Sequence, residues 1–345
     1  MTSTSHAPTS GTPAASDPGR STGPLSRLPV PSIRVQKGVA LANVIAQIGI
    51  MTTGVTVRVT ASGLGCETWP QCNEASFVPV PGAAPALHQA VEFGNRLLTF
   101  VLAAVAVALL LAVYRAGRRR GLKALAWAMP AGILAQAVIG GITVLAGLAW
   151  WTVALHLLPS MILAWLAAVL FVRIGEADTA PPRRVMPKPM TWLTVLSAVL
   201  LTGVLTTGTM VTGAGPHAGD ARITAADRLQ LPIQWLVHFH AELMVGYVCL
   251  LIGLLAGLVA LRTEGPAIRR SAILIGLIAA QAVIGITQYQ LGVPELLVVA
   301  HVTLAGAITA VTGALWAAGV IRDRVPARQG RPPRQSPGYA SPLYG

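Results

Sequence analysis

The sequence predicts an all-α integral membrane protein, in which eight transmembrane helices form two tandem four-helix bundles and both termini are cytoplasmic. Composition, the spacing of apolar stretches and an internal repeat support this prediction. Of the 345 residues, 54% are hydrophobic and only 11% are charged, whereas a soluble domain has about 25% charged residues. This composition excludes an ordinary cytosolic enzyme.

Eight apolar stretches are long enough to cross a bilayer core of about 30 Å, which takes about 20 helical residues. They cover residues 38–57, 88–114, 122–146, 150–174, 190–212, 233–261, 267–290 and 294–321. We therefore expect an N-terminal bundle over 35–175, a cytoplasmic linker over 176–189 and a C-terminal bundle over 190–322. The ends, 1–34 and 323–345, are poor in apolar residues and are predicted to be disordered cytoplasmic tails.

The basic residues predict the orientation. Of the 25 Lys and Arg residues, 21 lie in the two tails and in the connections that follow the second, fourth and sixth stretches. The opposite connections contain only Arg58, Arg222 and Arg228, and Arg96 lies within the second stretch. Because cytoplasmic loops carry the excess of Lys and Arg, both termini are expected in the cytoplasm. Topology thus accounts for the net charge of +13, and no nucleic-acid partner is expected.

An internal repeat relates the two halves. Gln-Ala-Val-Ile-Gly occurs at 136–140 and again at 281–285. The same offset pairs His156 with His301, and Asn95 with His240. Thr-Thr-Gly also recurs, at 52–54 and 206–208, with an offset changed by unequal loops. Each unit has an even number of spans, so both have the same orientation, and a cofactor site is expected between facing helices.

Two histidines of the second half point to a heme. A single histidine near a helix end is most often a polar residue that hydrogen-bonds between helices. His240 and His301, however, lie near the outer ends of two helices of one bundle, at similar depth. Two neutral imidazoles can hold a heme iron from both sides, whereas zinc or copper would need three or four ligands. The pair therefore favours a b-type heme.

The equivalent site of the first half has lost one histidine. His156 is retained, but Asn95 occupies the position of its partner, and an amide is a poor ligand for heme iron. A heme whose iron is bound by protein on one side only can react as a substrate, so we expect a substrate pocket here. His88 lies seven residues before Asn95, about 10 Å away along the helix, and could cap this pocket.

Glu92 lies one turn before Asn95 and has two interpretations. It can form an ion pair with Arg96 at i+4, or it can transfer protons beside the pocket. Both hold if Arg96 also meets a heme propionate. An ionisable side chain at this depth is a functional candidate.

Three cysteines complete the set of candidates. Cys66 and Cys72 lie in an outer loop that faces an oxidising compartment, so a disulfide is expected. A structural role is favoured over a redox-sensitive one. Cys249, in the middle of a helix, is expected in the core.

The joint order of these features resembles the heme A synthase family, bacterial type, over residues 35–322. The features are the cysteine pair, Glu-Phe-Gly-Asn-Arg at 92–96, His156, and the pair His240 and His301. The resemblance implies an oxidoreductase that converts the C8 methyl of heme O to a formyl group, with water as the oxygen source. The product would be heme A for cytochrome c oxidase.

The resemblance also implies the site residues. Heme b would bind His240 and His301 in the C-terminal bundle, and the substrate heme would bind His156 in the N-terminal bundle. Glu92 would be catalytic. Asn95 stands where the family often has a second histidine, so the substrate site has one dependable protein ligand. The expected location is the plasma membrane, with sites near the extracytoplasmic face. Heme O synthase is an expected partner, and a homo-oligomer is one option.

Two other classes remain open from the residues alone. A membrane b-type cytochrome of a quinol-linked chain would use the same histidine pair, but should carry two stacked bis-histidine hemes. A heme carrier or transporter would favour broken helices and polar residues at the midplane. Pro130, Gln136 and Gln281 fit that class, but the two glutamines are repeat equivalents, which favours a role in packing.

Overall fold

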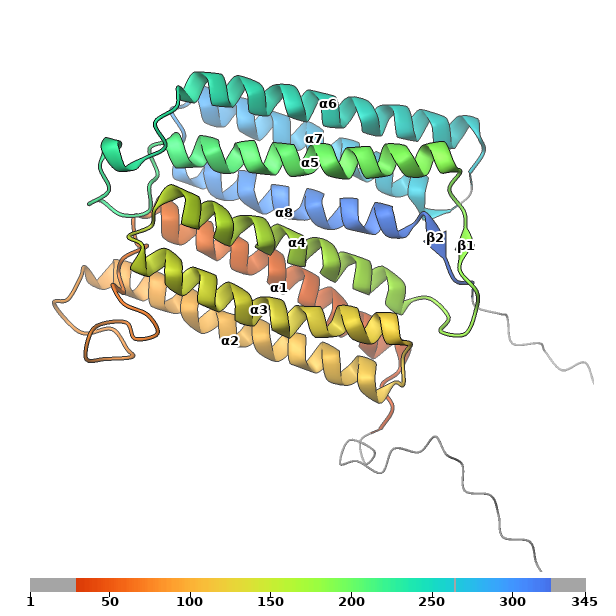
Figure 1. Ribbon diagram of the computed structural model, residues 1–345, viewed down its shortest axis with the longest axis horizontal. Helices are drawn as coiled ribbons and strands as arrows, with labels where there is room; N and C mark the ends of the chain where they lie inside the picture. Colours follow the sequence, from red (N-terminus) through yellow and green to blue (C-terminus); the bar gives the residue numbers. More distant parts are fainter. Residues whose placement is uncertain (1–28, 264, 324–345) are drawn as a thin grey trace, which may run out of the picture.

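The protein is described here by a computed structural model covering residues 29–263 and 265–323, in which eight long helices run side by side (Figure 1). They are α1 (Ile33–Val59), α2 (Ala86–Arg115), α3 (Arg120–Leu145), α4 (Trp150–Ile174), α5 (Lys188–Ala214), α6 (Ile233–Ala260), α7 (Pro266–Gln290) and α8 (Glu295–Ala317). Each is long and apolar enough to cross a membrane. The predicted all-helical membrane fold is confirmed, while most of both predicted tails lies outside the described residues.

Two helix ends differ from the sequence prediction by more than two residues. α1 begins five residues before the predicted start, because the Ser32 hydroxyl accepts a hydrogen bond from the Val35 amide and caps the helix. α8 ends at Ala317, four residues before the predicted end. The chain then forms β2 (Val320–Ile321), which pairs antiparallel with β1 (Arg183–Arg184) in the predicted linker. Hydropathy detects neither a cap nor a two-residue strand.

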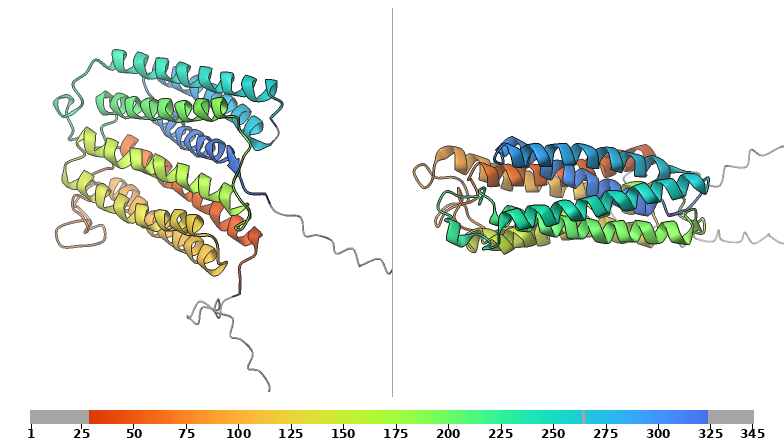
Figure 2. Two further views of the ribbon diagram at one scale, coloured as in Figure 1. Left: turned by 45° about the vertical axis from the view of Figure 1, so that its right-hand side comes forward. Right: turned by 90° about the horizontal axis from the view of Figure 1, so that it is seen from above.

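The helices divide into two groups of four (Figures 1 and 2). α1 to α4 lie together in one half and α5 to α8 in the other, and the halves pack through α1, α4 and α8. The hydroxyls of Thr52 in α1 and Thr303 in α8 are 2.9 Å apart. The indoles of Trp165 in α4 and Trp316 in α8 meet edge to face, with ring centres 5.9 Å apart. Both polar and aromatic contacts therefore join the halves.

The two ends of the molecule differ in their connections. One end, which we call the loop end, carries the long segments 60–85 and 215–232. The other, the basic end, carries the connections α2–α3, α4–α5 and α6–α7, and both ends of the described chain lie there (Figure 1). The arginine-rich segments are thus on one side, as predicted. The assignment of that side to the cytoplasm stays a prediction.

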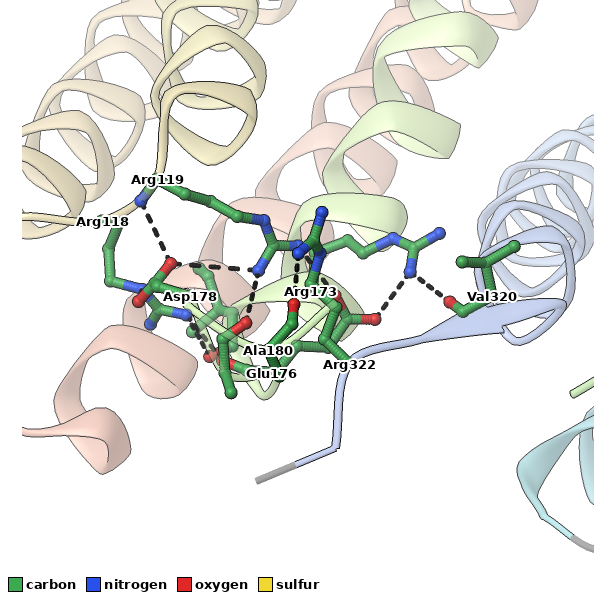
Figure 3. A network of polar contacts seen from close by, with 10 residues as sticks. Arg118, Arg119, Arg173, Glu176, Asp178, Ala180, Val320 and Arg322 are labelled. Carbon is green, nitrogen blue, oxygen red and sulfur yellow. Dashed lines mark hydrogen bonds and ion pairs between the residues drawn. The ribbon is translucent and has the colours of Figure 1, made fainter. Parts of the chain in front are cut away.

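A network of arginines and carboxylates joins segments at the basic end (Figure 3). Arg118 Nε lies 2.7 Å from Asp178, and Arg119 Nη2 lies 2.7 Å from Glu176. Arg173 of α4 also contacts Glu176, at 2.6 Å, and donates to a backbone carbonyl of β2. The network holds the segment after α4 against the α2–α3 turn and the chain that follows α8.

The two large apolar cores both lie toward the basic end. In the first half the core includes Leu109 of α2, Met129 of α3 and Leu170 of α4. In the second half it includes Leu254 of α6 and Leu274 of α7. The candidate site residues lie nearer the loop end than most residues of these two cores.

Three polar side chains of α6 face outward. Cys249 is exposed, so the prediction of a core position was wrong. The sequence signal failed because the part of α6 around Cys249 is apolar on all sides, so no polar residue there marks which face is exposed. Glu242 is exposed, and His238 is exposed with its Nδ1 2.8 Å from the Gln234 carbonyl oxygen of the same helix.

Candidate functional site

The imidazoles of His240 and His301 face each other across the second half. Their ring centres are 6.4 Å apart and the rings are inclined by 48°. His240 lies seven residues into α6, and His301 lies six residues into α8. Both are therefore about 10 Å from the loop end of their helices, as their sequence positions predicted.

The orientation of His240 is set by α5. Its Nδ1 lies 3.0 Å from the carbonyl oxygen of Val204 and 3.1 Å from Oγ1 of Thr207. A carbonyl oxygen only accepts, so Nδ1 carries the proton and Nε2 keeps a free lone pair. Histidines that bind metals commonly donate their second ring nitrogen in this way.

Glycines make room for both rings. A Cβ at Gly208 of α5 would come within 3.2 Å of His240 Cε1, and a Cβ at Gly285 of α7 would come within 3.2 Å of His301 Cε1. The amide of Gln281 donates to the carbonyl oxygen of His301 at 3.1 Å. The Nδ1 atom of His301 is buried and has no hydrogen-bond partner among the described residues.

This geometry fits a six-coordinate iron with one axial imidazole on each side. Metal–nitrogen bonds of about 2 Å on both sides would place the two ring centres about 6 Å apart, close to the observed 6.4 Å. Within 29–263 and 265–323, no three His, Cys, Asp or Glu side chains converge as a metal site. A two-ligand center is therefore compatible with the residues present, and a tetrahedral zinc site is not.

The first half repeats this arrangement with one substitution. The amide of Gln136 donates to the His156 carbonyl oxygen at 2.8 Å, as Gln281 does for His301. A Cβ at Gly140 would come within 3.1 Å of His156 Cε1. His156 Nδ1 is likewise buried, and no partner for it lies in the described chain. The repeat thus extends from the sequence to the surroundings of each histidine.

Asn95 occupies the place of His240 in the first half. Thr53 of α1 donates to Asn95 Oδ1 at 2.6 Å, and Thr207, the equivalent of Thr53 in the Thr-Thr-Gly repeat, contacts His240. The amide is therefore held by the same framework as the imidazole. The two positions share a threonine neighbour and differ in the side chain that it contacts.

Glu92 is buried in α2 and receives hydrogen bonds from two directions. The backbone amide of Cys66 donates to Oε2 at 2.7 Å. Arg96 Nη2 lies 2.6 Å from Oε1. Arg96 also donates to the carbonyl oxygens of Cys66, Thr68 and Gln71. The predicted i+4 ion pair is therefore present, and the donors of Arg96 are engaged by the loop rather than left for a propionate.

The loop above Glu92 is closed by a disulfide between Cys66 and Cys72, as predicted. It packs closely on the helices: a Cβ at Gly65 would come within 2.5 Å of the His88 carbonyl oxygen, and one at Gly141 within 2.3 Å of the Trp69 ring. His88 lies in the first turn of α2, under this loop.

The two outer loops are joined by Arg222. Its Nη1 lies 2.6 Å from Glu67, and its Nε lies 2.8 Å from Asp220. The amide of Gly63 donates to the Gly219 carbonyl oxygen at 2.8 Å. Burial opposes the ionisation of Asp220, but hydrogen bonds from Arg222 outweigh it and hold the pKa of Asp220 below its usual value.

Sequence reasoning missed several contributors to the site. The loop carbonyls that hold Arg96 have no side-chain signal. The glycines next to the histidines and the threonines behind His240 and Asn95 do have one, because they lie within the Gln-Ala-Val-Ile-Gly and Thr-Thr-Gly repeats or directly beside them. A repeat that includes small and hydroxylated residues marks the surroundings of a ligand as well as the ligand itself.

Eight candidate spans, a facing histidine pair and a related arrangement in the other half define a multi-pass membrane protein made of two similar four-helix halves. A family model described as "Cytochrome oxidase assembly protein" (COX15-CtaA) matches residues 38–313. The chain therefore belongs to the COX15-CtaA family, which includes heme A synthases. The predicted family is confirmed.

Two curated relatives carry the name "Heme A synthase". The protein of Lysinibacillus sphaericus (strain C3-41) is 33% identical over 147 residues, which cover 42% of this chain and 47% of the relative. The protein of Bacillus licheniformis is 28% identical over 145 residues, which cover 41% of this chain and 46% of the relative. The chain thus matches slightly less than half the length of each.

Proposed function

We propose that this protein is a heme A synthase, which oxidises the C8 methyl group of heme O to a formyl group with water as the oxygen source. Membership of the COX15-CtaA family supports the reaction class. The observation that carries the proposal is the unequal pair of sites. The second half offers two facing imidazoles, and the first half keeps the same framework around His156 and Asn95.

The second-half site is assigned to heme b, which His240 and His301 would hold. A heme held by two imidazoles would supply one-electron transfer. Val204 and Thr207 fix the ring of His240, and Gly208 and Gly285 leave space for the two imidazoles. The carbonyl of Val204 also raises the basicity of the ligating nitrogen.

The first-half site is assigned to the substrate. His156 would bind the iron of heme O from one side, and Asn95 would face it without forming a strong bond. His88 and Arg96 complete the pocket, His88 at its outer rim and Arg96 by holding the loop in place. A weakly ligated substrate can enter and leave, which suits turnover.

Glu92 is assigned the role of proton acceptor. Removal of two electrons and one proton from the methyl group leaves a cation-like carbon, to which water adds. The proton that water releases passes to the Glu92 carboxylate. A second round gives a hydrated aldehyde, which loses water to leave the formyl group. Overall one water is consumed, and four electrons and four protons leave. Arg96 and the Cys66 amide orient the Glu92 side chain, on which the proton would be taken up.

The wider setting follows from the same proposal. The basic end lies in the cytoplasm, so both sites lie near the extracytoplasmic face of the plasma membrane. The N-terminal bundle, 35–175, binds the substrate and the C-terminal bundle, 190–322, binds heme b. Heme O synthase supplies the substrate, and an external electron acceptor takes the electrons.

The test is chromatography of hemes extracted from the purified protein, after expression in a host that makes heme O and lacks its own heme A synthase. Heme A together with heme B is the expected result. Heme B alone would favour a b-type cytochrome and contradict the proposal. No heme at all would favour a carrier that has lost its cargo and would equally contradict it. The His240→Ala/His301→Ala double variant is the control, and should lose heme B.

A further inference from the structure

Two arginines from different halves meet at the loop end without a counter-ion. Arg58 lies in the last turn of α1, and its Nη2 donates to the carbonyl oxygen of Thr212 in α5 at 3.1 Å. Arg228 lies in the outer loop, where the next residue, Leu229, donates its amide to the Gly213 carbonyl oxygen at 3.0 Å. Arg58 and the residue that follows Arg228 therefore donate to neighbouring carbonyls in the outer turn of α5, those of Thr212 and Gly213.

The acidic residues of this region are engaged elsewhere. Asp220 and Glu67 bind Arg222, and Asp227 accepts from Thr224. Among the described residues, neither Arg58 nor Arg228 forms an ion pair. The Nε atoms of both are buried and lack hydrogen-bond partners there. Buried cations with unfilled donors are costly unless an anion joins them.

The start of α6 adds to this positive field. The N-cap residue, Pro232, has no side chain that can accept a hydrogen bond from the first turn. Arg228, Leu231, Pro232 and Ile233 line an open pocket of about 410 Å³ at this point. Free amides and the helix dipole favour an anion at a helix N-terminus, so the start of α6 and Arg228 both favour an anion at this pocket.

This place lies directly outward from the histidine pair. Thr212, which Arg58 contacts, is five residues beyond Thr207, which contacts His240. The rise along α5 is about 7 to 8 Å. Along α6, the first residue, Ile233, is seven residues before His240, a rise of about 10 Å. The carboxylates of a heme occupy one edge of its porphyrin, and cations at the loop end would draw that edge toward them.

We propose that Arg58 and Arg228 form the carboxylate-binding end of the second-half site and neutralise the propionates of the heme held by His240 and His301. The inference rests on the proposed function of that histidine pair. Arg58 belongs to α1 and the histidines to α6 and α8, so the first half contributes a residue to the cofactor site of the second half. Bound carboxylates would therefore fasten the two halves together at the loop end.

The test compares iron protoporphyrin IX with its dimethyl ester, which lacks the propionate charges. Each is added to the purified heme-free full chain in detergent, without heme O, and binding is followed by the low-spin absorption band. The wild type should bind the free acid roughly ten-fold more tightly than the ester, the worth of a charge-assisted hydrogen bond. Arg58→Gln and Arg228→Gln should lose most of this preference, and Arg58→Lys should keep part of it.

Arg120→Gln is the control, because it removes one positive charge from an exposed position at the start of α3, at the basic end, and should leave the preference unchanged. An equal preference in the wild type and in both glutamine variants would overturn the inference, including the case in which the arginines serve the substrate heme instead. A wild type that binds both porphyrins with equal affinity would also overturn it. Failure of the wild type to form any low-spin band would instead refute the assignment of His240 and His301.

Discussion

Thr53 donates a hydrogen bond of 2.6 Å to Asn95, at the position where Thr207 contacts His240 in the other half. The pairs α1–α2 and α5–α6 therefore use equivalent threonines to hold different side chains. The two halves thus share this threonine contact, and the side chain that it holds differs between them. The difference between an electron-transfer site and a substrate site is proposed to lie mainly in this exchange of an imidazole for an amide.

Asn95→His should restore the missing ligand. The variant is expected to retain heme O through gel filtration and to gain about one further low-spin heme per chain, because two imidazoles can then hold the iron. Heme content and electron paramagnetic resonance measure this. Asn95→Gln, which keeps an amide, is the control. No additional low-spin signal in the histidine variant would contradict the facing arrangement of residues 95 and 156.

Glu92→Gln should halt the reaction without removing heme b. The amide cannot take up the proton that water releases, and loss of a general base typically costs a factor of about 10² to 10⁴. The measurement is conversion of heme O in membranes, together with the heme b spectrum. Glu67→Gln is the control, because Glu67 is an exposed carboxylate of the loop that covers Glu92, and this variant should retain activity. Full conversion by the Glu92 variant would remove this residue from the mechanism.

Gly285→Ala and Gly140→Ala should affect the two sites separately. Their Cβ atoms would approach His301 and His156 to 3.2 Å and 3.1 Å, and overpacking of this kind costs about 1–3 kcal/mol. We expect Gly285→Ala to weaken the retention of heme b, and Gly140→Ala to slow heme O conversion while heme b stays bound. Gly276→Ala, on the same helix as Gly285, meets nothing within 4 Å and is the control. Identical effects of all three variants would contradict separate sites.

The junction of the two outer loops should open in acid. Because the pKa of Asp220 is held below its usual value of about 3.9, its stabilising contribution is present above that value and is lost as the pH falls through the lower, folded-state pKa. The Gly63 amide donates to Gly219. Its protection factor, the ratio of the exchange rate of an unprotected amide to the observed rate, should fall in that range. Asp220→Asn should weaken protection at neutral pH and flatten the acid response. A pH response identical to that of the wild type would exclude Asp220 as its source.

The sequence predicted the eight spans because length and hydropathy suffice to identify a helix in lipid. It did not predict the first turn of α1, which depends on the Ser32 cap, or the pairing of Val320 with Arg184. The histidine pair was predicted because a repeat aligns His240 and His301 at one depth. The contacts of Arg96 with loop carbonyls were not predictable, because they depend on the path of an irregular backbone. The meeting of Arg58 and Arg228 likewise depends on how the halves pack.

Most residues of the two large apolar cores lie toward the basic end of the helices, and Val204 of the second core borders His240. Insertion and anchoring of the chain therefore do not depend on any prosthetic group, and biogenesis can proceed in two stages. A newly made apoprotein is expected to accumulate in the membrane at normal abundance when porphyrin supply is limited. Heme would then bind later, at the loop end.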